Sequence, residues 1–181
     1  TIKKAIFIFV YLLTSITLIA NNTLLYSKII DKIIIEGPQS QPVLSAINAI
    51  PLSTTPESVL DPTLIQDDLK TLYATGYFSS INAQSTQEKD QHILHIICIE
   101  NPNIQTLAIQ TQSSFIQNKL QKSFKKFLNT PLNTPQLNDT KQTLITWFKK
   151  QGYSFFDIIT MSFHKQSQTL HISATDGIIE S

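Results

Sequence analysis

The chain has 181 residues, of which 41% are hydrophobic and 15% are charged, a balance that excludes a disordered chain and indicates globular domains. The formal net charge of +1 argues against a general nucleic-acid binder, and the single cysteine excludes both a disulfide framework and a metal site of paired cysteines. Residues 28–103 carry 4 Lys against 9 acidic residues, whereas residues 104–181 carry 8 Lys against 4. We expect the acidic and the basic half to suit docking to each other or to partners of opposite charge.

The first residues have the pattern of a targeting segment. Lys3-Lys4 precede an apolar run of 16 residues from Ala5 to Ala20, after which the sequence turns polar. The run is shorter than the ~20 residues of a typical membrane-spanning helix, but Leu18 stands where a cleavage site usually has a small side chain. We therefore expect residues 1–25 to be a signal peptide or a membrane anchor, and the remainder to be exported.

The next segments predict a strand, a short helix and a loop. Ile29–Glu36 is rich in β-branched residues and is followed by Gly37-Pro38, which is typical of a strand. Pro42–Ala49 predicts a short helix with its apolar residues on one side, and the proline-rich residues 50–62 predict a loop.

A second helix is predicted between Asp61-Pro62 and Gly76. Asp is a favourable N-cap, Pro suits the first helical turn, and Gly adopts the left-handed conformation that ends many helices. Ile65, Leu69 and Leu72 form an apolar stripe, whereas the adjacent Asp67 and Asp68 are expected on the solvated face.

Two strands and a polar turn complete the first unit. We predict a strand from Tyr77 to about Ser85, a turn over Ser85–Gln91, and a very apolar strand over His92–Ile99. In the last strand, Leu94, Ile96 and Cys98 are expected to face the helices.

The same order of elements follows in the second half. The sequence predicts a strand over Ile104–Thr111, a helix over Ser114–Leu128, a helix from Thr134-Pro135 to Gly152, and a hairpin of Phe156–Phe163 with Thr169–Thr175. Along Phe156–Phe163, alternation places Ile159, Met161 and Phe163 on one face. We expect the Trp147 side chain to pack in the core or to contact the other module.

A constant shift of 76 residues relates the two halves. It carries Gly76-Tyr77 onto Gly152-Tyr153 and Leu94-His95-Ile96 onto Leu170-His171-Ile172. We therefore predict an α+β protein with two tandem β-α-α-β-β modules, residues 26–102 and 103–181. Each is expected to have a three-stranded mixed sheet with two helices on one face and the last strand in the middle.

This order of elements resembles tandem polypeptide-transport-associated (POTRA) domains. The matching residues are Ile33-Ile34-Ile35-Glu36-Gly37, Gly76-Tyr77-Phe78-Ser79-Ser80-Ile81, and Leu94–Ile99 running into Glu100-Asn101-Pro102-Asn103-Ile104. Gly152-Tyr153 and Leu170–Ile179 are similar in the second module. Such domains precede the membrane barrel of outer-membrane assembly factors, two-partner secretion transporters and the chloroplast outer-envelope import channel. Ser113 departs from the glycine that the family often has after the first strand.

The resemblance implies a receptor for unfolded or partner polypeptides, associated with a membrane β-barrel that is either a C-terminal continuation of the chain or a separate subunit. It also implies a location on the periplasmic side of a bacterial outer membrane or in the intermembrane space of a plastid envelope. Physically, the strand after Gly-Tyr would be an open sheet edge to which an extended peptide can add. The residues expected to bind polypeptide are Ile81, Asn82, Ala83, Gln84 and Ser85, and Ile158, Ile159, Thr160, Met161 and Ser162.

A second candidate surface is basic. Lys119, Lys122 and Lys126 recur at helical spacing on Ser114–Leu128, with Lys125 beside them. They are expected to lie on the outside of that helix, where they form a solvated face or contact an anionic lipid surface or acidic segments.

No catalytic site is predicted. The four glycines are too far apart to form a phosphate-binding loop or a nucleophile elbow. His92 and His95 fall on opposite faces of a strand, and Cys98 is interpreted as a small buried hydrophobic residue. We expect no enzyme, no cofactor, no metal and no nucleic-acid partner.

Two other interpretations belong to different functional classes. A membrane-anchored scaffold, similar to the bacterial division proteins that carry one such module behind a spanning helix, would need a true span and a single module. The short apolar run and the doubled module favour the first interpretation instead. An RNA-binding α+β module requires a GxxG loop or exposed aromatic residues on the sheet, and neither is predicted.

Overall fold

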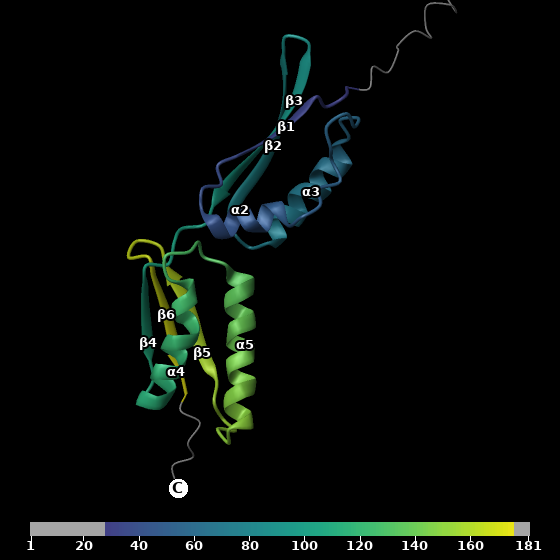
Figure 1. Ribbon diagram of the computed structural model, residues 1–181. Coiled ribbons are helices and arrows are strands. Elements are labelled where there is room, and N and C mark those ends of the chain that lie inside the picture. Colours follow the sequence, from purple (N-terminus) through teal and green to yellow (C-terminus); the bar gives the residue numbers. More distant parts are fainter. Residues whose placement is uncertain (1–27, 176–181) are drawn as a thin grey trace, which may run out of the picture.

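The computed structural model describes residues 28–175, so the predicted signal or anchor segment, residues 1–25, lies outside the described residues. Figure 1 shows two similar units in succession, each a sheet with helices on one face. The elements of the first are β1 (Lys32–Glu36), α2 (Gln41–Asn48), α3 (Pro62–Ala74), β2 (Phe78–Glu88) and β3 (Gln91–Glu100). Those of the second are β4 (Thr106–Gln110), α4 (Ser114–Phe124), the 3-10 helix η1 (Lys125–Phe127), α5 (Thr134–Lys150), β5 (Ile158–His164) and β6 (Thr169–Ala174).

The two sheets have the same topology. Their strand orders are β1-β3-β2 and β4-β6-β5, with the first pair of each sheet parallel and the second antiparallel. Because parallel neighbours need a crossover, the two helices of each unit connect the outer strand to the hairpin. The predicted α+β fold, with two β-α-α-β-β modules and the last strand in the middle, is confirmed.

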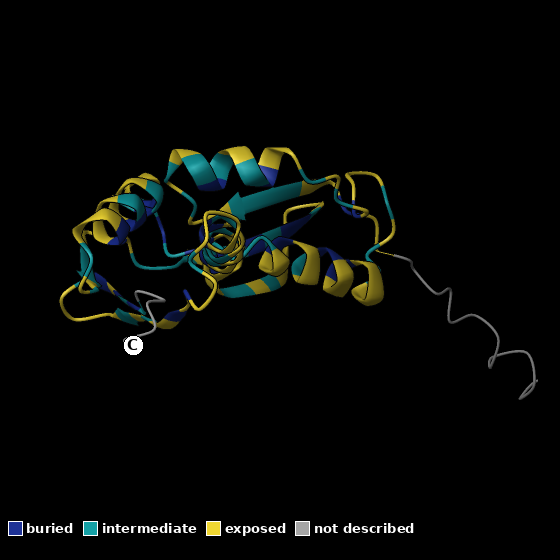
Figure 2. Ribbon diagram, turned by 90° about the horizontal axis from the view of Figure 1, so that it is seen from below, coloured by how far each residue is buried: buried dark blue, intermediate teal, exposed yellow. Residues whose placement is uncertain are grey.

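Each module has its own hydrophobic core. The buried apolar residues form two clusters with no member in common, one between α2, α3 and the first sheet and one between α4, α5 and the second. Figure 2 shows the buried residues on the sides of the helices that face the sheets. As predicted, Leu94, Ile96 and Cys98 are buried in the first core, and the second is dominated by Phe124, Phe148 and Phe156.

The helix boundaries follow from capping. The Asp61 carboxylate accepts a hydrogen bond from the Thr63 N–H at 2.8 Å, and Gly76 has a φ of 80° at the end of α3, as predicted. In the second module the N-cap is Asn133 rather than Thr134, because the Asn133 side chain accepts from the Gln136 N–H at 3.1 Å. The predicted helix over Ser114–Leu128 is α4 followed by η1.

The prediction for Asp68 is wrong, because this side chain is buried. Its two carboxylate oxygens accept hydrogen bonds from the Ser53 and Thr54 N–H groups, each at 2.8 Å. Burial by itself raises the pKa of Asp68, but the hydrogen bonds from Thr54 and Ser53 outweigh it and hold the pKa below its usual value. Asp68 therefore fastens the loop before α3 to the helix. Asp67 lies at the surface beside Lys70.

The predicted turn over Ser85–Gln91 is also wrong. β2 continues to Glu88 and β3 begins at Gln91, so that the turn consists of Lys89 and Asp90, with Lys89 at a φ of 55°. Backbone pairing needs no apolar side chains, and Figure 1 shows the tip of this hairpin extending beyond the helices. The polar residues belong to exposed strand.

A bulge changes which residues of β5 face the core. The register shifts between Ile158 and Thr160, so Ile158 is fully buried while Ile159 is 60% exposed. The prediction that Ile159 shares a face with Met161 and Phe163 is therefore wrong, and Ile158 takes the inward position.

Within residues 28–175, no helix combines the length and the apolar character that spanning a membrane requires.

Candidate polypeptide-binding site

The edge formed by β2 is the longest open edge of the two sheets. β2 has 11 residues and pairs only with β3, its Ile81 lying opposite Cys98 and its Ser85 opposite Leu94. No strand within residues 28–175 pairs with its other side. At ~3.4 Å per residue the edge is about 35 Å long, so it has room for an extended peptide, and it contains all five residues predicted for this module.

A shallow groove runs beside this edge. It has a volume of about 320 Å³, lies between α3 and β2, and is lined by Gln66, Leu69, Lys70, Tyr73, Ala74 and Ile81. The Tyr73 side chain is 55% exposed, although it is large and aromatic. A strand added to β2 would direct every second side chain towards this groove, a feature that the sequence analysis did not find.

The edge formed by β5 is shorter and irregular. Its seven residues pair only with β6, and the five predicted residues, Ile158–Ser162, include the bulge at Ile159. Ile158 faces the core. The side chains that β5 exposes to a partner are therefore those of Ile159, Thr160 and Ser162. β2 has a similar register shift between Phe78 and Ser80, but nine residues follow it in continuous pairing, Ser80–Glu88, against five in β5, Thr160–His164. We therefore rank β2 above β5.

Each sheet has a second edge that the sequence analysis did not consider. β1 and β4 have five residues each and pair only with β3 and β6. A three-stranded open sheet always has two edge strands. The predicted strand order therefore already implied that the first strand of each module is an edge. On β1, the Glu36 carboxylate is hydrogen-bonded to His95 Nδ1 at 2.6 Å, and Thr86 Oγ1 lies 3.1 Å from His95 Nε2.

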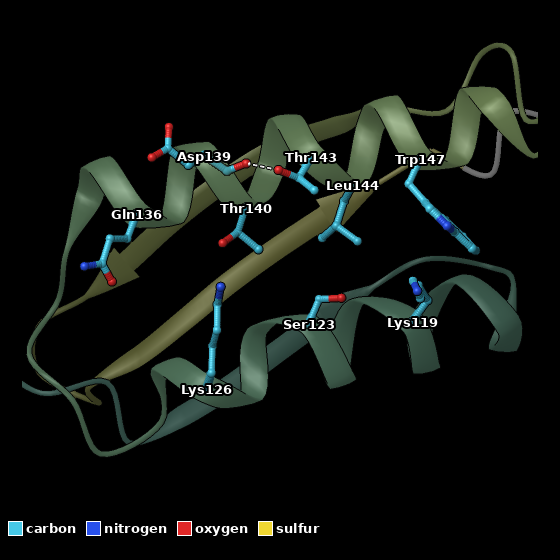
Figure 3. Close-up of a pocket in the computed structure, with 9 residues that line it drawn as sticks. All are labelled: Lys119, Ser123, Lys126, Gln136, Asp139, Thr140, Thr143, Leu144 and Trp147. Carbon is cyan, nitrogen blue, oxygen red and sulfur yellow. Dashed lines mark hydrogen bonds between the residues drawn. The ribbon is translucent and has the colours of Figure 1, made fainter.

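The predicted lysines do not form one surface. Lys119 and Lys126 line a groove of about 500 Å³ between α5 on one side and α4 with η1 on the other. Figure 3 shows Lys126 pointing towards α5 and Trp147 pointing towards α4, whereas Asp139 points away from the groove. Lys122 and Lys125 line a different groove of about 440 Å³ beside β4. A flat anionic surface would therefore meet only part of this set at a time.

Trp147 lies in the first of these grooves. The Lys119 ammonium is 4.0 Å from the centre of its ring, and the indole packs edge-on against Phe148 at 5.0 Å between centroids. Trp147 thus packs within its own module.

The junction between the modules consists of hydrogen bonds between neutral groups. Asn101 Nδ2 donates to Gly76 O at 2.9 Å and to Leu132 O at 2.8 Å. Asn133 Nδ2 donates to Thr75 O at 2.8 Å, and Gln136 Nε2 donates to the Tyr77 hydroxyl at 2.8 Å. The two ion pairs found among the described residues lie inside the first module, so opposite charge does not join the halves directly.

Asn133 connects the ends of two helices. It is 1% exposed, its Oδ1 caps the N-terminus of α5, and its Nδ2 reaches the last turn of α3. A Cβ atom on Gly76 would lie 2.6 Å from Pro135 Cδ, so glycine is needed here both for its conformation and for the close approach. The conformation was predicted from the sequence; the contact was not.

Within residues 28–175, no group of three or more His, Cys, Asp or Glu side chains is placed to hold a metal ion. Cys98 is buried, as predicted, and burial raises the pKa of its thiol. The rings of His164 and His171 lie side by side, tilted by 51°, with centroids 4.6 Å apart.

This chain is similar to solved structures of cyanobacterial proteins. The N-terminal domain of Omp85 from the thermophilic cyanobacterium Thermosynechococcus elongatus is 19% identical, with a TM-score of 0.68 over 84% of this chain and 64% of that one. POTRA1-2 of the periplasmic domain of Omp85 from Anabaena is 17% identical, with a TM-score of 0.56 over 84% of this chain and 97% of that one. POTRA1-3 of the same Anabaena domain is 16% identical, with a TM-score of 0.60 over 84% and 63%.

No protein-family model matches the sequence, and no curated protein is significantly similar to it. This chain spans about two thirds of the length of the Thermosynechococcus domain and of the three-domain Anabaena structure, and nearly all of the two-domain one. The likeness to these structures agrees with the sheet topology and the doubled order of elements: residues 28–175 are two tandem modules with the POTRA fold.

Proposed function

We propose that this chain is a non-enzymatic, polypeptide-binding region of a machine that assembles or transports outer-membrane proteins. It captures unfolded or partner polypeptides by adding them as a further strand to β2, and secondarily to β5. The observation that carries the proposal is the open 11-residue edge of β2 with an apolar groove beside it. Main-chain hydrogen bonds supply affinity without reading sequence, and the groove adds a preference for apolar side chains at alternate positions.

The fold supports a location for this activity beside an outer membrane. Two of the similar structures are described as parts of the periplasmic domain of Omp85. By analogy with them, the modules face the periplasm, or the intermembrane space of a plastid envelope, and stand beside a membrane β-barrel in the same or another chain. The lysines of the two grooves, Lys119 with Lys126 and Lys122 with Lys125, are available to acidic segments or anionic headgroups nearby.

Strand addition has a direct signature in amide hydrogen exchange. The chain is titrated with an unfolded outer-membrane barrel protein, and exchange is followed at Ile81–Ser85 and Ile158–Ser162. Pairing protects the edge amides, so we expect slower exchange there, larger in β2 than in β5. Unchanged exchange at both segments with saturating client would rule out the proposal.

The groove is tested with a matched pair of variants and a strand peptide of alternating apolar residues. Tyr73→Ala removes an exposed ring from the groove, whereas Ile99→Ala removes an equally exposed side chain, 57% against 55%, elsewhere in the same module. The contact that the Tyr73 ring makes with a bound peptide contributes ~1–1.5 kcal/mol to the binding free energy, so its loss raises Kd about tenfold. We expect Tyr73→Ala to weaken binding and Ile99→Ala to leave it unchanged; equal effects would exclude the groove as a binding element.

A further inference from the structure

The outer face of the first sheet carries a histidine whose ring is fully engaged. His95 lies on β3 between Leu94 and Ile96, which are buried, so its ring stands on the face away from the helices. Its Nδ1 is bonded to the Glu36 carboxylate at 2.6 Å, and its Nε2 lies 3.1 Å from the Thr86 hydroxyl. Both ring nitrogens of His95 therefore have partners on the neighbouring strands β1 and β2.

His171 occupies the same place in the second sheet but has different neighbours. Counted along the strand registers from the two histidines, the position of Glu36 on β1 is taken by Gln110 on β4. The position of Thr86 on β2 is taken by His164 on β5. A carboxylate and a hydroxyl are thus replaced by an amide and a second imidazole.

The two imidazoles of the second sheet lie together and have no other polar partner. His164 and His171 are both exposed, and their rings are 4.6 Å apart between centroids. Within residues 28–175, no hydrogen bond or ion pair reaches either ring. A neutral imidazole has one nitrogen that donates and one that accepts, so each ring offers an uncommitted lone pair to a ligand.

This spacing suits two imidazoles that bind the same metal ion. Zn–N bonds of ~2.0–2.1 Å place the centroids of two neighbouring imidazole ligands about 4.5–5 Å apart. The observed 4.6 Å therefore requires no movement of the strands, and rotation of the two exposed side chains is enough to aim one nitrogen of each ring at a common ion. Both ligands belong to one hairpin, β5 and β6 joined by residues 165–168, which holds them on a rigid support.

We propose that His164 and His171 form a two-histidine site for a divalent transition-metal ion, of which Zn²⁺ is the simplest probe. Imidazole suits Zn²⁺, Ni²⁺ and Cu²⁺, whereas Mg²⁺ and Ca²⁺ require oxygen ligands. The strands β4, β5 and β6 contain no Asp or Glu, so the face favours the first group of ions. Water completes the coordination on the solvent side. The site is independent of polypeptide capture, because it uses neither the edge amides of β2 nor the groove beside it.

The test titrates Zn²⁺ into the chain and follows the imidazole nitrogens by long-range ¹H–¹⁵N NMR, with calorimetry for the stoichiometry. We expect one saturable site per chain. The nitrogen resonances of His164 and His171 should shift together, whereas those of His95 should stay in place, and Mg²⁺ should produce no shift. This measurement uses the unaltered chain. No saturable binding, or shifts confined to other histidines, would overturn the proposal.

The variants are His164→Phe and His171→Phe, which keep an aromatic ring but remove its nitrogens. Loss of an outer-shell partner already lowers metal affinity by ~10–100-fold, so loss of a ligand should raise the Kd for Zn²⁺ at least about tenfold. Zn²⁺ should raise the Tm of the wild type and of the matched control His95→Phe, but not that of either variant. Affinity retained by either variant, or lost equally in the control, would show that the pair does not bind the ion.

Discussion

Replacing Asn133 separates its two roles. In Asn133→Ala the N-cap of α5 is lost, which costs about 1 kcal/mol. The hydrogen bond to Thr75 O across the junction is lost as well, worth about 1 kcal/mol more. The sum is about 2 kcal/mol, or a fall in Tm of roughly 4–8 °C for a chain of this size. Asn133→Asp keeps the cap but replaces the donor by a buried carboxylate beside Thr75 O, so it should cost at least about 1 kcal/mol.

The assay is urea unfolding followed by the fluorescence of Trp147, the only tryptophan of the chain. It lies on α5, the helix that Asn133 caps, so its signal reports on the second module. Asn138→Ala is the matched control, because Asn138 is an exposed residue of the same helix with no capping role. It should stabilise α5 by a few tenths of a kcal/mol through helix propensity.

Two outcomes would refute this account of the junction. The first is an Asn133→Ala variant within ~0.5 kcal/mol of the wild type, which is the scale of an ordinary surface substitution. The second is an Asn133→Asp variant as stable as the wild type, because the hydrogen bond from Asn133 to Thr75 O would then contribute nothing.

Further predictions concern the other close contacts. Asp68→Asn should cost about 2 kcal/mol of unfolding free energy at pH 7, because it weakens the charge-assisted hydrogen bonds. Folding lowers the pKa of Asp68, so this contribution is present above the unfolded pKa of ~3.9 and is lost as pH falls through the folded pKa. The urea midpoints of the variant and the wild type should therefore converge in acid. Gly76→Ala should destabilise more than Gly152→Ala by at least ~1 kcal/mol in thermal unfolding, because both strain a positive φ but only the first meets the neighbouring module; equal losses would contradict the junction. Lys119→Gln should shift the emission of Trp147 while changing the free energy of unfolding by less than ~1 kcal/mol, and an unchanged spectrum would show that the ammonium does not lie over the indole in solution.

The repeated Gly-Tyr pairs made the fold predictable. Gly76 and Gly152 both adopt positive φ after a helix, as the chemistry of glycine requires, and Asp61 caps α3 as its sequence context indicates. The apolar strand over His92–Ile99 is long and continuous, which placed β3 in the middle of its sheet. These features are local or have a fixed period, so they can be read without knowing what packs where.

The features that could not be predicted depend on distant partners. Asp68 looks like a surface carboxylate beside Asp67, and only the return of the loop at Ser53 and Thr54 makes it a buried acceptor. The polar stretch before Lys89 has no alternation of apolar residues, so the sequence does not indicate that it pairs with β3. The bulge that exposes Ile159 depends on the register with β6.

The candidate site was predicted only in outline. The edge over Ile81–Ser85 followed from the strand order, but the groove that Tyr73 lines depends on how α3 packs beside β2. Likewise, the helical spacing of Lys119 and Lys122 indicated one basic face, whereas the packing of α5 and β4 divides it between two grooves.

The capture of clients is tested most directly by isotope-filtered NMR of the labelled chain with an unlabelled outer-membrane strand peptide. Strand addition predicts intermolecular NOEs between the peptide backbone and alternate residues of Ile81–Ser85, with peptide side chains close to the Tyr73 ring. NOEs confined to the outer faces of the helices, or to β1 and β4, would contradict it.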